Sequence, residues 1–152
     1  MASTAPSVEA IVICGAWMGE TERIAQALID RTLPKAEWTH EAHLRAGLWH
    51  VDAHGPFAAL DLLRDRISAY NESVGTANTD TSGYHETITR CYVVVIDRFL
   101  STVDRSSDLD VLAGQLIAQY GDRRLLLHHY SEKRLFSAVA RRAWIEPDLR
   151  PI

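Results

Sequence analysis

Apolar residues recur every three or four positions along most of the chain, which is the spacing of amphipathic helices. Proline and glycine punctuate this pattern at Pro34, Gly55-Pro56, Gly75 and Gly121. The pattern predicts helices over residues 20–33, 39–54, 57–75, 84–102 and 108–120, and a last helical stretch from Asp122 that breaks near Ser131 or Ser137. We therefore predict an all-α fold, a compact bundle of five or six helices.

The chain of 152 residues has a length typical of one domain. Residues 1–7 are small and polar and predict a flexible N-terminal arm, so residues 8–152 form the predicted single helical domain. Residues 8–18 are rich in β-branched side chains and contain Gly15, and the pattern there leaves a short strand and the start of a helix both open.

The formal net charge of −4 argues against a dedicated nucleic-acid binder, which needs a basic surface. Basic residues nevertheless outnumber acidic ones from Asp122 to Arg150, and this segment is either a solvated helical surface or a contact for an anionic ligand or acidic partner. Cys14 and Cys91 lack metal-site spacing and are expected to be reduced and buried. No stretch has the pattern of a signal peptide or a membrane span, so we expect a cytoplasmic protein that does not enter the membrane.

Four histidines fall on one face of the predicted helix over residues 39–54: His40, His43, His50 and His54. At 100° per residue they lie within roughly 80° of one another, opposite the charged side chains of Glu41, Arg45 and Asp52. A helix rises about 1.5 Å per residue, so His40 and His54 are about 21 Å apart along the axis and do not share one ion. Either His40 with His43 or His50 with His54 forms a half-site, and the second pair lies where the helix is expected to fray.

The segment Tyr84–Thr89 at the start of the next predicted helix supplies a further histidine, His85, at the edge of the apolar face. His40, His43 and His85 are therefore the predicted ligands of a divalent zinc, iron or manganese ion, since such sites combine side chains from two helices. Glu86 is expected to face solvent or to cap the helix, and without HExxH spacing it has no assigned role as a general base. Residues expected around the site are Tyr84, Thr89, Tyr92 and His50.

The segment Leu125–Arg134 is the second candidate for a functional site. One of His128 and His129 is expected to reach the core, and Lys133 and Arg134 are candidate ligands for a carboxylate or phosphate. The alternative is a capped helix end with a charged exterior.

The segments Trp38–Leu44 and Gly83–Thr89, with the patterns W-T-H-x-x-H-L and G-Y-H-E-T-I-T, resemble small helical bacterial proteins of uncharacterised function. The resemblance runs from about Leu33 to Pro147 and points to His40, His43 and His85 without implying an activity. A more distant likeness is to DinB-type helical metalloproteins, which hold a metal with one early histidine and a later H-x-x-x-H pair. Here the late pair is the adjacent His128 and His129, so that likeness is one of architecture only.

Three functions remain open, and the first is the leading hypothesis. It is a metal-dependent enzyme that acts on a small molecule at the three histidines. The second is a non-catalytic protein that binds or senses a small ligand or a haem, and the third is a helical interaction module whose histidines are bonded within the core. The pattern does not decide between a monomer and a homo-oligomer.

Overall fold

A computed structural model describes residues 18–152 of the chain, and every regular element in that range is helical. Five long helices account for most of it: α2 (Glu20–Asp30), α3 (His40–His54), α4 (Pro56–Ser73), α5 (Glu86–Leu100) and α6 (Leu109–Tyr120). The all-α prediction is thus confirmed. The expectations for residues 1–7 and most of the segment 8–18 concern residues outside the described range.

The predicted sixth helix is divided into short elements. After α6 the chain forms a 3₁₀ turn and two short helices: η2 (Leu125–His128), α7 (Glu132–Leu135) and α8 (Ala138–Arg142). Another 3₁₀ turn, η1 (Lys35–Glu37), precedes α3. Ser131 and Ser137 are the N-caps of α7 and α8, so the predicted breaks at these two serines are real helix boundaries.

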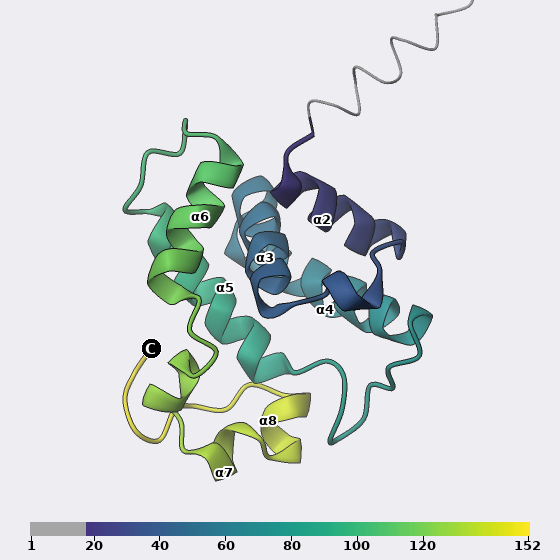
Figure 1. Cartoon of the computed structure of the whole chain (residues 1–152). Helices are drawn as coiled ribbons and strands as arrows, with labels where there is room; N and C mark the ends of the chain where they lie inside the picture. The colour runs from purple at the N-terminus through teal and green to yellow at the C-terminus, as the bar shows by residue number, and fades with distance from the viewer. Residues whose placement is uncertain (1–17) are drawn as a thin grey trace, which may run out of the picture.

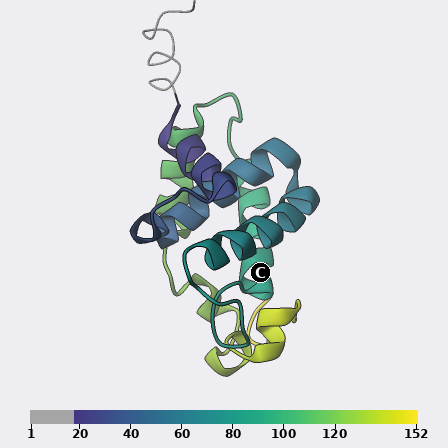
Figure 2. The same cartoon turned by 90° about the vertical axis from the view of Figure 1, so that its right-hand side faces the viewer.

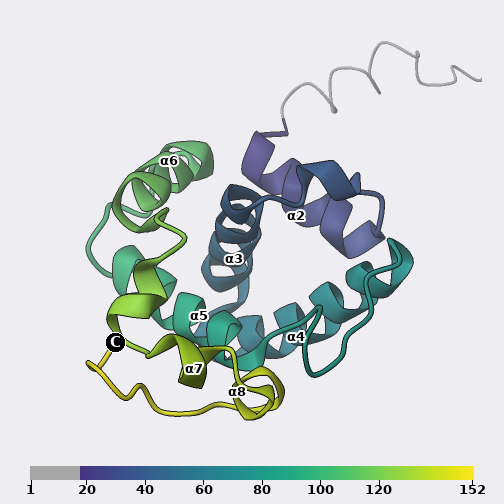
Figure 3. The ribbon, with the colours of Figure 1, turned by 60° about the horizontal axis from the view of Figure 1, so that its bottom comes forward.

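Helix α3 lies at the centre of the bundle and packs against α2, α4, α5 and α6 (Figure 3). The short helices α7 and α8 lie together at one end of the molecule, where α8 packs against α5 (Figures 1 and 2). Residues of all five long helices, α2 to α6, form a large apolar core. A smaller apolar cluster packs α5 against the C-terminal segment and contains Cys91, Leu126, Tyr130 and Leu135. No helix within residues 18–152 is long and apolar enough to cross a membrane.

The ends of α3 follow from its local sequence. The Thr39 hydroxyl accepts a hydrogen bond from the backbone N–H of Ala42, as expected of an N-cap residue. Gly55 takes a φ of 77°, which L side chains rarely adopt, and Pro56 then occupies the first turn of α4. This sharp junction fixes the direction of α4 relative to α3 and so shapes one side of the pocket described next.

Candidate functional site

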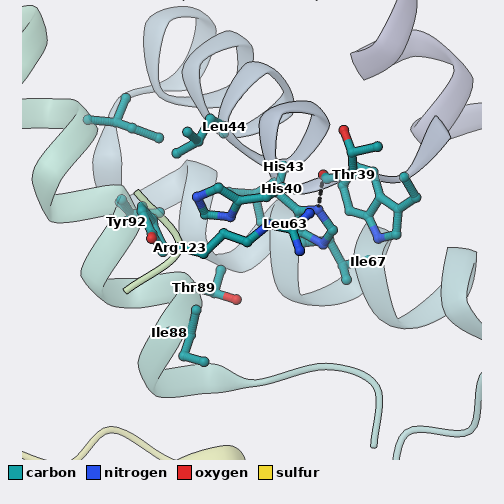
Figure 4. A pocket seen from close by; sticks show the side chains of 14 residues that line it. Thr39, His40, His43, Leu44, Leu63, Ile67, Ile88, Thr89, Tyr92 and Arg123 are labelled. Atoms are coloured by element: carbon teal, nitrogen blue, oxygen red, sulfur yellow. Dashed lines mark hydrogen bonds between the residues drawn. The ribbon is translucent and has the colours of Figure 1, made fainter. Parts of the chain in front are cut away.

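A pocket of about 470 Å³ lies where α3, α4 and α5 meet the segment after α6 (Figure 4). Most of its wall is aliphatic or aromatic, and its polar side chains come from α3, α5 and the segment after α6. The apolar lining is Trp38, Leu44, Gly47, Leu63, Ile67, Ile88, Val93 and Ile96, and the polar lining is Thr39, His40, His43, Thr89, Tyr92 and Arg123. Of the predicted site residues, His40, His43, Thr89 and Tyr92 are therefore brought together.

The ring of His43 is fixed by two neighbours. Its Nδ1 donates a hydrogen bond to the backbone carbonyl of Thr39 at 2.6 Å, and the ring stacks on Trp38 with 3.7 Å between centroids. This bond places the proton of the neutral ring on Nδ1 and leaves Nε2 as an acceptor. Solvent reaches part of the residue, but dense protein atoms around the ring remove hydration and lower the pKa of His43.

His40 occupies the other end of the same helical turn. Its Nε2 is buried and forms no hydrogen bond of normal geometry within the described part of the chain, although the backbone carbonyl of Gly121 lies close enough to the ring to oppose the lowering of its pKa. The ring meets Tyr92 of α5 edge to face, with 5.7 Å between centroids. Desolvation lowers the pKa of His40, and the nearby positive charge of Arg123 lowers it further.

Arg123 reaches the pocket from the segment after α6. In Figure 4 its side chain extends between His40 and Thr89. Its guanidinium forms neither an ion pair nor a hydrogen bond with any residue in the range 18–152. Thr89 donates from its hydroxyl to the backbone carbonyl of His85 at 2.9 Å, so it is already bonded within its own helix.

His85, the third predicted metal ligand, is not part of the pocket wall. It is the N-cap of α5: its Nδ1 accepts the backbone N–H of Ile88 at 3.2 Å, and its Nε2 donates to the backbone carbonyl of Leu135 at 2.8 Å. Both ring nitrogens are engaged, and the pKa of His85 is lowered by desolvation. Within residues 18–152 no group of three or more His, Cys, Asp or Glu side chains is placed to hold a metal ion. The three-histidine metal site stays a prediction.

The other histidines of α3 lie away from the pocket. His50 is fully buried, donates from Nδ1 to the backbone carbonyl of Ala46 at 2.7 Å and accepts from Arg66 at Nε2 at 2.8 Å. Desolvation lowers the pKa of His50 to about 4. His54 is exposed at the helix end, so the histidine face is only partly turned inward. Arg45, expected on the solvent face, instead donates to Thr21 and Asp110 and ties α3 to α2 and α6.

Glu86 neither faces solvent nor caps the helix, so the prediction for this residue is wrong. Its carboxylate is buried, with 11% of the side chain exposed, and receives two hydrogen bonds from Arg64, at 2.9 and 2.6 Å. The hydroxyl of Tyr84 donates to the same carboxylate at 2.7 Å, so Tyr84 belongs to this ion pair and not to the pocket wall. The helical wheel could not show this, because the partner Arg64 comes from α4.

The predicted anion contacts Lys133 and Arg134 lie on α7, apart from the pocket. Both are exposed, and Arg134 donates to the backbone carbonyl of Glu146 at 2.7 Å, which helps to hold the C-terminal tail. Of the late histidine pair, His128 is exposed and His129 is half-buried with its Nδ1 2.8 Å from the carbonyl of Pro151, so neither enters the main core.

Sequence reasoning did not single out Trp38 or Arg123 as site residues. Trp38 stood in the W-T-H-x-x-H-L pattern, directly before the helix cap, and Arg123 stood in the basic segment that begins at Asp122. The basic excess of that segment was therefore a usable signal, but the fold decides which of its arginines lines an apolar pocket.

Comparisons with known proteins identify no relative of this chain. No protein-family model, no curated protein and no solved structure matches the chain.

Proposed function

We propose that the protein binds a small, mostly apolar organic molecule in the pocket between α3, α4 and α5. The observation that carries the proposal is the pocket itself: about 470 Å³, with apolar walls and a few polar side chains that converge from three segments. This size and this mixture are typical of small-molecule sites in proteins. A binding or sensing role therefore has more support than an interaction module with histidines bonded only within the core.

The construction of the walls supports the same proposal. Leu44, Leu63, Val93 and Ile96 are at most 4% exposed and belong to the main apolar core, so their positions are set by the packing of the bundle. A site carried by packed helices loses little conformational freedom when a ligand enters. The pocket is thus expected to admit a ligand without a large rearrangement.

A metal-dependent enzyme is the second candidate, and one observation favours it. The Nδ1 of His43 donates to a backbone carbonyl, which is the arrangement that commonly orients a metal-binding imidazole through its other nitrogen. The buried Nε2 of His40 comes from the same helical turn. This candidate ranks second because zinc and iron sites usually have three or more protein ligands, and His85 is bonded elsewhere.

The test is a binding screen with small aryl and alkyl compounds, each with a neutral or charged head group, detected by ligand-observed NMR. We expect several aryl compounds to bind wild-type protein with dissociation constants between about 1 μM and 1 mM. The variant Ile88→Trp places a large side chain in the pocket and should abolish this binding. The variant Asp97→Trp adds the same side chain at an exposed position of α5 and should retain it.

Two outcomes would contradict the proposal. One is that no compound binds to the wild-type protein. The other is that compounds bind equally to wild type and Ile88→Trp, because binding would then lie outside the pocket. Circular dichroism of both tryptophan variants checks that the helices persist.

A further inference from the structure

We propose that the ligand of this pocket is an arylalkyl carboxylate whose carboxylate pairs with Arg123. This inference rests on the proposed function and specifies the chemical class of the ligand. It stands on two features of the pocket: a guanidinium with no partner in the described range, and an aromatic wall beside it.

Arg123 is available for an anion. Arg123 is exposed and, like several other arginines of the described range, forms no ion pair with Asp or Glu. Its side chain nevertheless lines the pocket and does not point only into solvent. A guanidinium presents N–H groups in a planar fork that matches the two oxygens of a carboxylate.

The charges at this end of the pocket favour a monoanion over a dianion such as phosphate. Arg123 is the positive group in the described wall, and the acidic residues near His40, Asp122 and Glu41, do not line the pocket. His43 on α3 and Tyr92 on α5 are uncharged, because desolvation lowers the pKa of His43 and raises the pKa of Tyr92 to about 12. One positive charge in the described wall therefore matches one carboxylate.

The apolar wall indicates the rest of the ligand. Trp38 and His43 present stacked rings, and Tyr92 lies on the opposite helix, α5. Aromatic side chains bind planar rings by offset stacking or edge contacts. Aliphatic side chains of α4 and α5, including Ile67 and Ile88, complete the enclosure, so a ring on a short alkyl chain fits better than a polar sugar or nucleoside.

The experiment uses 4-phenylbutyrate and its neutral amide, 4-phenylbutanamide, in titration calorimetry with the whole chain. We expect wild type to bind the carboxylate about tenfold more tightly than the amide, as a charge-assisted pair predicts. In Arg123→Gln the two affinities should become equal. In the matched control Arg124→Gln, which changes the adjacent arginine outside the pocket wall, the tenfold ratio should persist.

The outcomes separate the two proposals. Equal affinities for acid and amide in wild type, or a ratio unchanged in Arg123→Gln, would overturn the carboxylate inference while leaving the pocket as a binding site. Binding of neither compound would also overturn the carboxylate inference, whereas the proposed function fails only if no compound of the binding screen binds in the pocket.

Discussion

The Nε2 of His85 donates to the backbone carbonyl of Leu135 across 2.8 Å, and this bond joins the start of α5 to the end of α7. The other ring nitrogen accepts the backbone N–H of Ile88 and so caps α5. The neutral Nε2–H tautomer satisfies both contacts at once. His85 therefore has a structural role that a helical wheel, which places it only at the edge of an apolar face, does not reveal.

We predict that His85→Ala lowers the free energy of unfolding by about 2 to 3 kcal/mol, the combined loss of an N-cap and a buried hydrogen bond. Urea unfolding followed by circular dichroism measures the change. His85→Asn should recover part of it, because Asn is a good N-cap residue even though it does not reproduce the bond to Leu135. Equal stability of wild type and His85→Ala would show that neither bond contributes.

The metal prediction can be tested by the same variant. If a divalent metal binds in the pocket, His40 and His43 are the histidines that face it, and His85 is bonded to the backbone elsewhere. We therefore expect zinc binding measured by equilibrium dialysis, if present at one ion per chain, to be lost in His43→Ala and retained in His85→Ala. Loss of zinc in His85→Ala at unchanged helicity would instead support the three-histidine site.

Local sequence signals were sufficient to predict the five long helices. Thr39 and Asp108 cap α3 and α6 as their side chains predict, and Gly55-Pro56 separates α3 from α4. The helix boundaries were less accurate where tertiary contacts decide them. The segment from Asp122 has helical periodicity, but it forms a 3₁₀ turn and two short helices that begin at serine N-caps. Its backbone and side chains also donate hydrogen bonds to Asp148 and Glu146 of the C-terminal tail.

The pocket was only partly predictable, because its residues come from several helices. Periodicity placed His40 and His43 on an inward face, and both line the pocket. It could not pair Arg64 with Glu86, nor bring Arg123 beside His40, since these contacts depend on how α4 and the segment after α6 pack. The relative positions of two residues on one helix follow from helix geometry, whereas the relative positions of residues on different helices depend on how the helices pack.

The ion pair between Arg64 and Glu86 gives a prediction about stability. Burial disfavours the charged carboxylate, but hydrogen bonds from Arg64 and Tyr84 outweigh it, and the pKa of Glu86 is lowered. We expect Glu86→Gln to lower the free energy of unfolding by about 1 to 3 kcal/mol, because the two charge-assisted bonds from Arg64 are weakened. Chemical denaturation measures this change.

The control for that prediction is Asp61→Asn, which removes the other ion pair of Arg64. Asp61 is 75% exposed, so its pair is largely screened by water and should contribute less than about 0.5 kcal/mol. Equal effects of the two substitutions would contradict the assignment of Glu86 as the main partner of Arg64.

Acid should destabilise the fold through its neutral histidines, and His50 gives the clearest case. Its Nε2 accepts from Arg66, so protonation there would remove an acceptor and bring two positive charges together. The folded pKa of about 4 lies below the unfolded value of about 6.5, so this contribution is fully present above about pH 6.5 and is lost as the pH falls towards 4.

Over that range His50 should contribute a slope of about 1.4 kcal/mol per pH unit to the free energy of unfolding. Urea unfolding at several pH values measures the slope, to which His40, His43 and His85 also add, because their pKa values are lowered as well. In His50→Leu the slope should decrease, whatever the stability of that variant near neutral pH.

Val51→Ala is the matched control. It removes buried apolar atoms from the same helix without removing a titrating group, so it should lower the free energy of unfolding at every pH and leave the slope unchanged. A slope in His50→Leu equal to that of wild type would mean that His50 binds protons equally well in the folded and unfolded chains, which its burial against Arg66 argues against.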